Sequence, residues 1–229
     1  MSVDVLIPWS DTNDEHRLRA LEWVTGLYTE RCPTWTVILG RCPDGPWVKG
    51  RAVADALERS TADIVVIADG DVWCDATPDA AERGLRAHRW AMPHRWVKRI
   101  SQHGTDAVLS GERTMRNAPH EKREYNACQG GGIVVITREL YDRCPLDPRF
   151  AGWGHEDEAW AYALRLLHGQ RWTNPDGRLW HLWHPPQPRN GAYGAPASVE
   201  LRNEYRAVYK RKDRAGMAEL VAAAAAEYE

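Results

Sequence analysis

Apolar and amphipathic stretches alternate along the first 70 residues of the chain. Three short apolar runs cover residues 3–9, 34–40 and 62–71, with the sequences VDVLIPW, TWTVILG and ADIVVIADGD. The stretch between the first two runs carries apolar residues at helical spacing, namely Leu18, Leu21, Val24 and Tyr28. Residues 49–60 read as a second helix. Because strands that alternate with helices build a mostly parallel sheet, this pattern predicts an α/β fold with helices on both faces.

The pattern loosens in the second half of the chain. Strands are predicted at 106–110, 131–137 and 178–184, a helix at 155–168, and a helical segment at 198–226. No internal repeat or low-complexity linker interrupts the sequence. We therefore expect the second half to build onto the sheet of the first, followed by a helical C-terminal segment.

Composition places the chain among soluble globular proteins, with 229 residues of which 43% are hydrophobic and 27% charged. No run of about 18 apolar residues is present, and the N-terminus lacks the basic lead and apolar core of a secretory signal. We expect a cytoplasmic protein without a membrane partner. The five cysteines are odd in number and widely spaced, which favours free or buried thiols over disulfides or a zinc site.

Charge is distributed unevenly, although the net charge is only −2. The stretch from Arg83 to Arg123 carries ten Lys or Arg residues against three Asp or Glu, and a second basic cluster runs from Arg202 to Arg214. Such a run is either a solvated face or a surface for phosphates. Of the 30 basic residues 25 are Arg, and Trp outnumbers Phe twelve to one, a usage typical of high-GC genomes such as those of actinobacteria and their phages.

Asp69 and Asp71 flank a glycine where the buried run 62–71 ends. In open α/β sheets, ligands bind beyond the carboxyl ends of the strands. Two carboxylates at this spacing can face a hard cation such as Mn²⁺ or Mg²⁺ together with the oxygens of a diphosphate. The alternative is an ordinary turn, because Asp-Gly is a common turn pair.

His181 and His184 lie in the predicted strand 178–184. Side chains three apart in a strand point to opposite faces, so both can reach one metal only if the strand ends between them. The alternative is a structural role for each. One of the two is a candidate to complete a metal shell alongside carboxylates.

The segment GWGHEDE (152–158) leads directly into the predicted helix 155–168. Acidic residues at a helix N-terminus can be simple capping residues. Capping does not account for the two glycines, which let the backbone approach another group closely, or for Trp153, whose flat face suits a sugar ring. A carboxylate beside a sugar could accept a proton from an attacking hydroxyl. The run CQGGG (128–132) fits no common phosphate loop and predicts a backbone edge close to a ligand.

These segments together resemble glycosyltransferases of the GT-A fold, whose central sheet is Rossmann-like. DGD is similar to the DxD motif of that fold. GWGHED is similar to the GWGxED motif of β-1,4-galactosyltransferases and chondroitin N-acetylgalactosaminyltransferases, and HLWH to a histidine segment of the chondroitin enzymes. GGIVVITRELY looks like the glycine-rich strand and helix ahead of GWGxED. The four segments occur in the same order, and the resemblance spans about residues 3–185.

The resemblance implies roles for particular residues. Asp69 and Asp71 would hold the metal and the diphosphate, and His181 or His184 would be a further metal ligand. Asp157 would be the general base, with Glu156 bonded to the acceptor sugar. The remaining implied contacts are Trp153 on a sugar ring, Pro8 and Asp11 at the uridine, and Lys49 and Arg51 near the donor.

The implied organisation is a GT-A domain over residues 1–195, with a nucleotide-binding half (1–75) and an acceptor and metal half (76–195). Residues 196–229 form the C-terminal helical segment. The implied reaction is a Mn²⁺- or Mg²⁺-dependent transfer from a UDP-sugar, with inversion, to a glycan, a protein or a hydroxylated DNA base. His155 and Glu158 stand where the galactosyltransferases carry Gly and Asp, so the acceptor stays open. The alternatives are a sugar nucleotidyltransferase and a non-catalytic carbohydrate-binding module.

Overall fold

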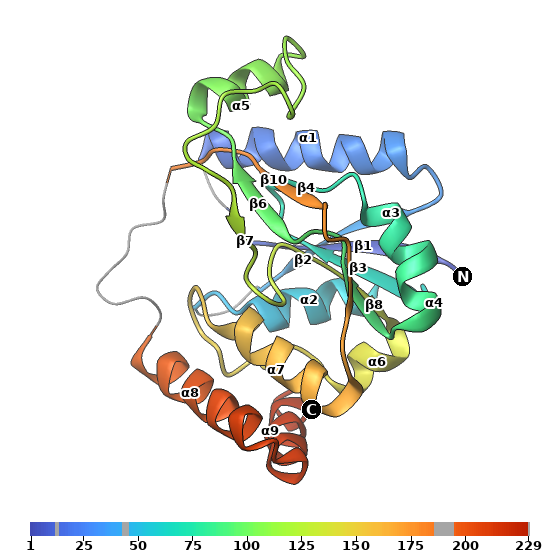
Figure 1. The fold of residues 1–229 in the computed structure, drawn as a ribbon, viewed down its shortest axis with the longest axis vertical. Coiled ribbons are helices and arrows are strands. Elements are labelled where there is room, and N and C mark those ends of the chain that lie inside the picture. The colour runs from blue at the N-terminus through green and yellow to red at the C-terminus, as the bar shows by residue number, and fades with distance from the viewer. Residues whose placement is uncertain (12–13, 43–45, 186–194, 229) are drawn as a thin grey trace.

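A six-stranded sheet runs through the centre of the molecule (Figure 1). The computed structural model describes residues 1–11, 14–42, 46–185 and 195–228. The strand order is β2-β1-β3-β8-β5-β9. Its strands are β1 (Val3–Trp9), β2 (Thr36–Arg41), β3 (Ile64–Ala68), β5 (Trp90–Met92), β8 (Ile133–Thr137) and β9 (Trp172–Thr173). Strand β1 pairs in parallel with β2 and β3, β8 is antiparallel to β3 and β5, and β9 is parallel to β5.

A second, smaller sheet packs beside the first. Its strands are β4 (Val72–Trp73), β6 (Trp96–Arg99), β7 (Tyr125–Asn126) and β10 (Arg178–His181). Their order is β4-β10-β6-β7, with β10 parallel to β6 and antiparallel to β4. Because β4 begins only a few residues after β3 ends, the small sheet starts at the carboxyl edge of the large one.

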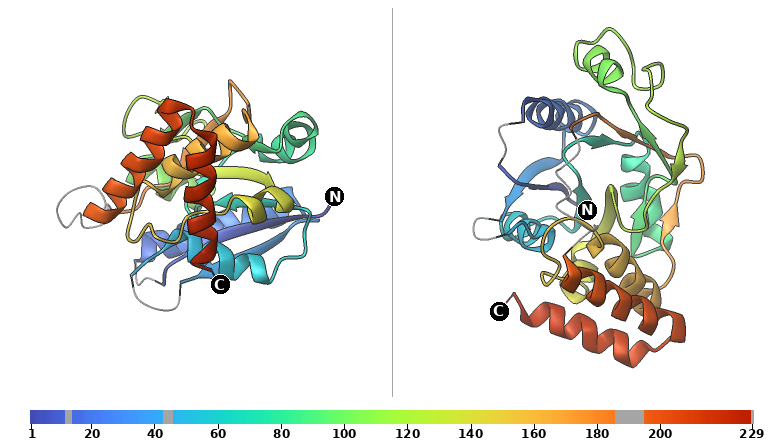
Figure 2. Two further views of the ribbon diagram at one scale, coloured as in Figure 1. Left: turned by 90° about the horizontal axis from the view of Figure 1, so that it is seen from below. Right: turned by 90° about the vertical axis from the view of Figure 1, so that its left-hand side faces the viewer.

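Helices cover both faces of the large sheet (Figures 1 and 2). Helix α1 (Glu15–Arg31) lies on one face, beside α5 (Gln102–Leu109). On the other face lie α2 (Lys49–Glu58), α6 (Arg138–Arg143) and α7 (Glu156–His168). The alternation of strand residues explains the two cores: Val5, Ile7 and Val66 pack with Leu21 and Val24, whereas Leu6, Val65 and Ile67 pack with Val53 and Leu164. The predicted α/β architecture with helices on both faces is confirmed, and three of the five strand pairings in the large sheet are parallel.

One close approach fixes a helix against the sheet edge. A Cβ atom at Gly40 in β2 would lie 1.8 Å from the Ala52 carbonyl oxygen of α2. Only glycine therefore permits this packing distance.

Three short helical turns follow β4 in the chain. They are α3 (Thr77–Asp79), the π-helix η1 (Ala80–Gly84) and α4 (Leu85–Ala87).

One predicted element differs in type from the structure. Residues 106–110 are predicted as a strand, but they lie in and just after helix α5, whose N-cap Ser101 accepts a hydrogen bond from Gly104 N. A short apolar run cannot distinguish a strand from a buried helix, which explains the error. The C-terminal segment is helical as predicted and consists of two helices, α8 (Pro196–Arg211) and α9 (Arg214–Ala226), which are separated where Lys212 is left-handed with φ 56° and Asp213 caps α9. This pair packs against α7.

Candidate active site

The carboxyl ends of β3 and β10 bring three potential metal ligands together. Asp71 follows β3, and its carbonyl oxygen accepts a hydrogen bond from Leu182 N at 2.9 Å. His181 is the last residue of β10, and His184 follows three positions later. Ligand atoms of Asp71, His181 and His184 all lie within 4.8 Å of one another. We call these residues the metal triad.

The end of β10 explains how both histidines reach one point. The strand stops at His181, so His184 is free of the strand alternation, and the two ring centroids lie 5.3 Å apart. Trp183 anchors the turn, because its backbone N donates to Thr105 Oγ1 at 2.8 Å and its ring packs on His16. His184 Nε2 lies 3.0 Å from Asp71 Oδ2.

The outer nitrogen of each imidazole faces a backbone carbonyl. His181 Nδ1 lies 2.7 Å from Leu182 O, and His184 Nδ1 lies 2.8 Å from Pro185 O. A metal-binding histidine characteristically donates its other N–H to such an acceptor, which leaves Nε2 for the metal. One carboxylate and two imidazoles form a mixed donor set, which fits Mn²⁺ better than Mg²⁺ because Mg²⁺ prefers oxygen ligands.

Electrostatics prepare two of the three triad residues, Asp71 and His181, for a cation, whereas they favour the protonated form of His184. Burial alone would raise the pKa of Asp71, but His181, His184 and Arg17 outweigh it and hold that pKa well below its usual value. Burial lowers the pKa of His181, so its imidazole stays neutral. For His184, burial is outweighed by the hydrogen bond to Asp71, and its pKa is raised.

A second cluster lies next to the triad and is centred on Lys49. The Nζ atom of Lys49, the first residue of α2, lies 2.9 Å from Asp157 Oδ1 and 3.0 Å from Asp69 Oδ1. The Lys49 side chain is 10% exposed and that of Asp157 21%, whereas Asp69 is 38% exposed. Asp69 and Asp71 thus have different partners, although both were predicted to share one metal. We call Lys49, Asp69, Asp157 and the buried Glu156 the carboxylate cluster.

The three carboxylates of this cluster, Asp69, Glu156 and Asp157, have one lysine as their positive partner, which disfavours ionisation of all three at once. Burial raises the pKa of Asp157 to about 7, and Glu156 and Asp69 add to the effect against the opposing pull of Lys49. Burial also raises the pKa of Glu156. Burial would lower the pKa of Lys49, but Asp157, Asp69 and Glu156 raise it well above its usual value. Asp157 therefore has the pKa of a group that can take up a proton near neutral pH.

The glycine run 130–132 packs against the first turn of α7. A Cβ atom at Gly131 would lie 2.8 Å from Asp157 Oδ2, and one at Gly130 would lie 2.3 Å from the Asp157 carbonyl oxygen. Asp69 N also donates to Gly132 O at 3.0 Å. The run was predicted to approach a ligand, which stays a prediction; among the described residues, Gly130 and Gly131 approach Asp157, and Gly132 approaches Leu179 and His94.

The three acidic residues at the start of α7 have separate surroundings. Asp157 points to Lys49, Glu156 is buried, and Glu158 pairs with Arg202 at 3.2 Å and accepts from Tyr162 at 2.6 Å. The preceding turn is left-handed at Gly152, Gly154 and His155, with φ values of 85°, 101° and 80°. This turn leaves Trp153 47% exposed, so that its ring is accessible to a ligand.

Of the other predicted contacts, one is buried in a strand and two lie on the surface. Pro8 is buried in β1. Asp11 is exposed and forms an ion pair with Arg41. Arg51 is exposed, and its electrostatic neighbour is Tyr228 near the C-terminus. Their contacts with a nucleotide stay predictions.

Two arginines beside the triad were not predicted from the sequence. Arg17, in the first turn of α1, places Nη2 3.0 Å from His184 Nδ1. Arg99 pairs across the small sheet with His181, and its Nε donates to Tyr125 Oη at 3.0 Å. No motif marks either residue, because only the folded chain brings α1 and β6 to the triad.

Arg17→Gln is expected to tighten Mn²⁺ binding in the absence of nucleotide. His184 Nδ1 cannot donate to Pro185 O and accept from Arg17 at once, so the arginine favours the tautomer unsuited to the metal. Its charge also opposes a cation, and removing it should raise the affinity roughly tenfold. The measurement is Mn²⁺ titration by electron paramagnetic resonance. Arg19→Gln, on the same helix but paired with Asp106, is the matched control; equal affinities in both variants would contradict the expectation.

Comparison with known proteins gives a match in structure alone. No family model and no curated protein sequence matches the chain. The catalytic domain of Drosophila β-1,4-galactosyltransferase 7, solved with xylobiose, superposes with a TM-score of 0.56 at 13% identity, over 89% of this chain and 80% of that one. S. aureus TarS 1–349 with UDP superposes with a TM-score of 0.51 at 11% identity, over 97% and 70%. The chain has the GT-A fold.

A third structure extends the similarity. GalNAc-T7, solved with UDP, GalNAc and Mn²⁺, superposes with a TM-score of 0.51 at 14% identity, over 91% of this chain but only half of that one. The GT-A fold predicted from the motif order is thus confirmed. Among the described residues, no helix is long and apolar enough to cross a bilayer.

Proposed function

We propose that the chain is a metal-dependent glycosyltransferase that moves a sugar from a nucleoside diphosphate sugar, by preference a UDP-sugar, to an acceptor hydroxyl. The observation that carries this proposal is the contact of Lys49 with both Asp69 and Asp157, next to the metal triad at the carboxyl edge of the sheet. The GT-A neighbours solved with UDP, Mn²⁺ and xylobiose support it. The cytoplasmic location, Arg51, Pro8 and Asp11 belong to the proposal as expectations.

The metal would be held by Asp71, His181 and His184. When bound, it supplies a Lewis acid that stabilises charge on the departing diphosphate. Asp69, two residues before Asp71 and 38% exposed, pairs with Lys49 at 3.0 Å, and its proposed role is toward the diphosphate. Because Asp71 stays ionised and His181 neutral, the triad needs no proton loss at these two residues to accept a cation.

Asp157 is the proposed general base. As the acceptor oxygen attacks the anomeric carbon, the bond from that carbon to the phosphate oxygen breaks and the hydroxyl proton passes to Asp157. The products are the glycoside with inverted configuration and the nucleoside diphosphate. Lys49 orients the Asp157 carboxylate through a 2.9 Å contact, and the glycine run keeps that carboxylate in place from the other side. Glu156 and the exposed Trp153 are the proposed contacts of the sugars.

Thermal melting with Mn²⁺ and a panel of nucleotides and nucleotide sugars tests this proposal. A ligand that binds only the folded chain adds about 2.7 kcal/mol at a hundred times its dissociation constant. We expect one nucleoside diphosphate to raise the melting temperature by several degrees, and EDTA to abolish the shift. No shift with any nucleotide would overturn the proposal, and release of pyrophosphate in place of a nucleoside diphosphate would indicate a nucleotidyltransferase. Sugar binding without any nucleotide response would indicate a carbohydrate-binding module.

A further inference from the structure

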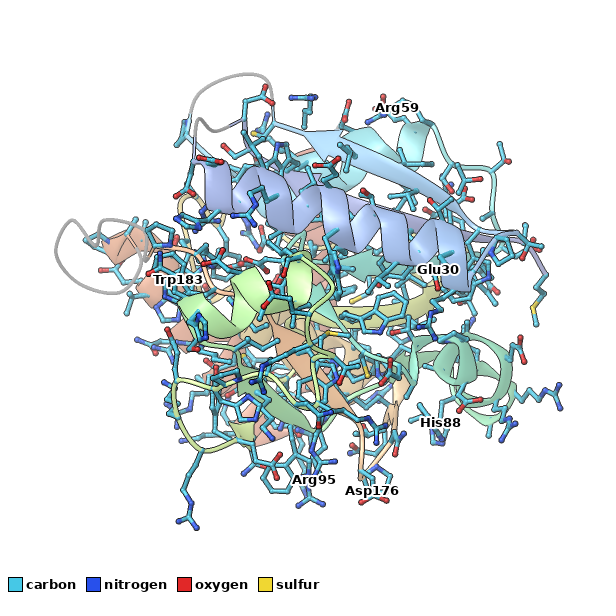
Figure 3. The ribbon with its side chains drawn as sticks, turned by 90° about the horizontal axis from the view of Figure 1, so that it is seen from above. Glu30, Arg59, His88, Arg95, Asp176 and Trp183 are labelled. Carbon is cyan, nitrogen blue, oxygen red and sulfur yellow. The ribbon has the colours of Figure 1, made fainter. Side chains whose placement is uncertain are left out.

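The helix that carries Lys49 begins without a capping side chain. Lys49 is the first residue of α2, and the N-cap is Val48, whose apolar side chain cannot accept a hydrogen bond from the first N–H groups. Figure 3 shows Arg59, which follows the last turn of α2, far from Trp183 in the turn of the metal triad. The helix thus meets the candidate site with its start, and neighbouring segments must hold that start in place.

Tyr228, near the C-terminus, packs on this first turn. A Cβ atom at Gly50, the residue after Lys49, would lie 2.6 Å from Tyr228 Oη and 3.2 Å from the carbonyl oxygen of Leu146. Tyr228 Oη donates a hydrogen bond to that carbonyl oxygen at 2.5 Å. Only glycine therefore allows the hydroxyl to reach the backbone beside Lys49. In Figure 2 the C-terminus accordingly lies beside α2.

A buried network fixes the helix pair that leads to Tyr228. Asp147, in the loop between α6 and α7, is 5% exposed and accepts a hydrogen bond from Tyr205 Oη of α8 at 2.9 Å. Asp147 also pairs with Arg149 at 2.6 Å, and Arg149 Nη2 donates to the carbonyl oxygen of Leu220 in α9 at 3.2 Å. Both helices are thus bonded to the same loop that accepts the hydrogen bond from Tyr228.

Helix α8 also holds the start of α7, which carries Asp157. Ser198 Oγ of α8 donates to the carbonyl oxygen of Ala151 at 3.2 Å, and Ser198 is only 1% exposed. Arg202 of α8 pairs with Glu158 at 3.2 Å. The helix therefore contacts the chain on both sides of Asp157.

Lys49 and Asp157 meet where these two helix starts face each other. The Lys49 Nζ atom lies 2.9 Å from Asp157 Oδ1. The backbone joins the same two starts, because Gly152 N donates to the carbonyl oxygen of Trp47 at 2.7 Å. A misplacement of about 1 Å can lower the rate of an enzyme by about 10²-fold. The supports of the two helix starts therefore bear on the reaction as well as on stability.

We propose that Tyr228 is a positioning residue, which sets the place of Lys49 and, through Lys49, that of the Asp157 carboxylate. This inference rests on the proposed glycosyltransferase function, in which Asp157 is the base. The helix pair α8–α9 lies after the motifs that resemble GT-A enzymes, and the inference gives it a part in the reaction. Ser198 and Arg202 hold the start of α7, and Tyr228 holds the start of α2.

The test observes the Lys49 ammonium group by NMR in protein labelled with ¹⁵N-lysine. The chain has five lysines, and within its described part Lys49 is the one that contacts carboxylates within 4 Å. These contacts should slow exchange of its ammonium protons with water, and the Lys49→Arg variant identifies the signal. Tyr228→Phe removes only the hydroxyl. We expect the Lys49 signal to shift and its protons to exchange roughly tenfold faster, the effect of one lost hydrogen bond.

Tyr205→Phe is the matched control. It makes the same chemical change in the same helix pair, but its hydroxyl is bonded to Asp147 and to the carbonyl oxygen of Leu220. This variant should lower the melting temperature and leave the Lys49 signal unchanged. Tyr228→Ala removes the ring as well, so it should disturb the Lys49 signal more than Tyr228→Phe does.

The rate of UDP release provides the second readout. The donor is the UDP-sugar that gives the largest melting shift, and water serves as the acceptor. At saturating donor, and at a temperature where each variant is folded, Tyr228→Phe should lower the rate roughly 10 to 100-fold. Tyr205→Phe should keep the wild-type rate, since a merely structural contact affects only the folded fraction.

Three outcomes would overturn the inference. They are a wild-type protein without a slowly exchanging lysine signal, a Lys49 signal that neither Tyr228 variant changes, and equal changes of signal and rate in Tyr228→Phe and Tyr205→Phe. Failure of the proposed function is seen separately, as the absence of the Mn²⁺- and UDP-dependent melting shift in the wild type. Tyr228→Phe should keep that shift.

Discussion

Asp157→Asn is expected to lower the rate of sugar transfer by about 10² to 10⁴-fold while leaving donor binding nearly unchanged. The amide keeps the size of the carboxylate, and its oxygen can still accept the hydrogen bond from Lys49. It cannot take up the hydroxyl proton, so only the chemical step suffers. The measurement is the transfer rate at saturating donor, with the dissociation constant of the nucleotide determined by calorimetry. Stability should not fall, since burial already disfavours the charge of Asp157.

The neighbouring carboxylate provides the matched control. Glu158 lies one residue farther along α7, but it is bonded to Arg202 and Tyr162 and does not face Lys49. Glu158→Gln makes the same chemical change on the same helical turn, and we expect wild-type transfer. Equal losses in both variants would point to a general effect of charge at the helix start. Equal loss of donor binding and rate in Asp157→Asn would count against its role as the base.

The sequence was most informative where local order decides the structure. Buried strands such as 62–71 are apolar on both faces, and the carboxyl end of a strand is a defined place in an α/β sheet. The positions of Asp69, Asp71 and the histidines at one edge could therefore be predicted. Whether His181 and His184 can both reach one metal depends on the residue at which β10 ends. In the structure β10 ends at His181, so both can.

Long-range packing decided the remaining features. Asp69 and Asp71 are two residues apart, yet Lys49 on α2 draws the first away from the metal triad. No local feature of the DGD sequence indicates that its two aspartates have different partners. Arg17 and Arg99 likewise reach the triad only because α1 and β6 pack there. The stretch 106–110 was mistaken for a strand because a five-residue apolar run satisfies both strand and buried helix.

Asp71→Ala is expected to abolish Mn²⁺-dependent nucleotide binding. Asp71 is the one carboxylate in the metal triad, and its low pKa makes it the charged ligand that offsets a divalent cation. Loss of a direct ligand should cost at least the roughly 10 to 100-fold in metal affinity that outer-shell partners of metal sites contribute. The measurement is the melting shift produced by the donor nucleotide with Mn²⁺, which should disappear in the variant.

Asp69→Asn separates the two clusters and so gives this prediction its sharpest form. If Lys49 remains the main partner of Asp69 when the metal is bound, this variant keeps most of its Mn²⁺ affinity. Asp75→Ala, in the turn after β4 and bonded to Trp73 Nε1, should keep all of it. A variant of Asp71 that binds the nucleotide with wild-type strength in Mn²⁺ would refute the metal role of the triad. An equal loss of Mn²⁺ affinity in Asp69→Asn would instead show that both aspartates bind the cation. A carboxylate that only pairs with Lys49 should affect metal affinity much less than a direct ligand does.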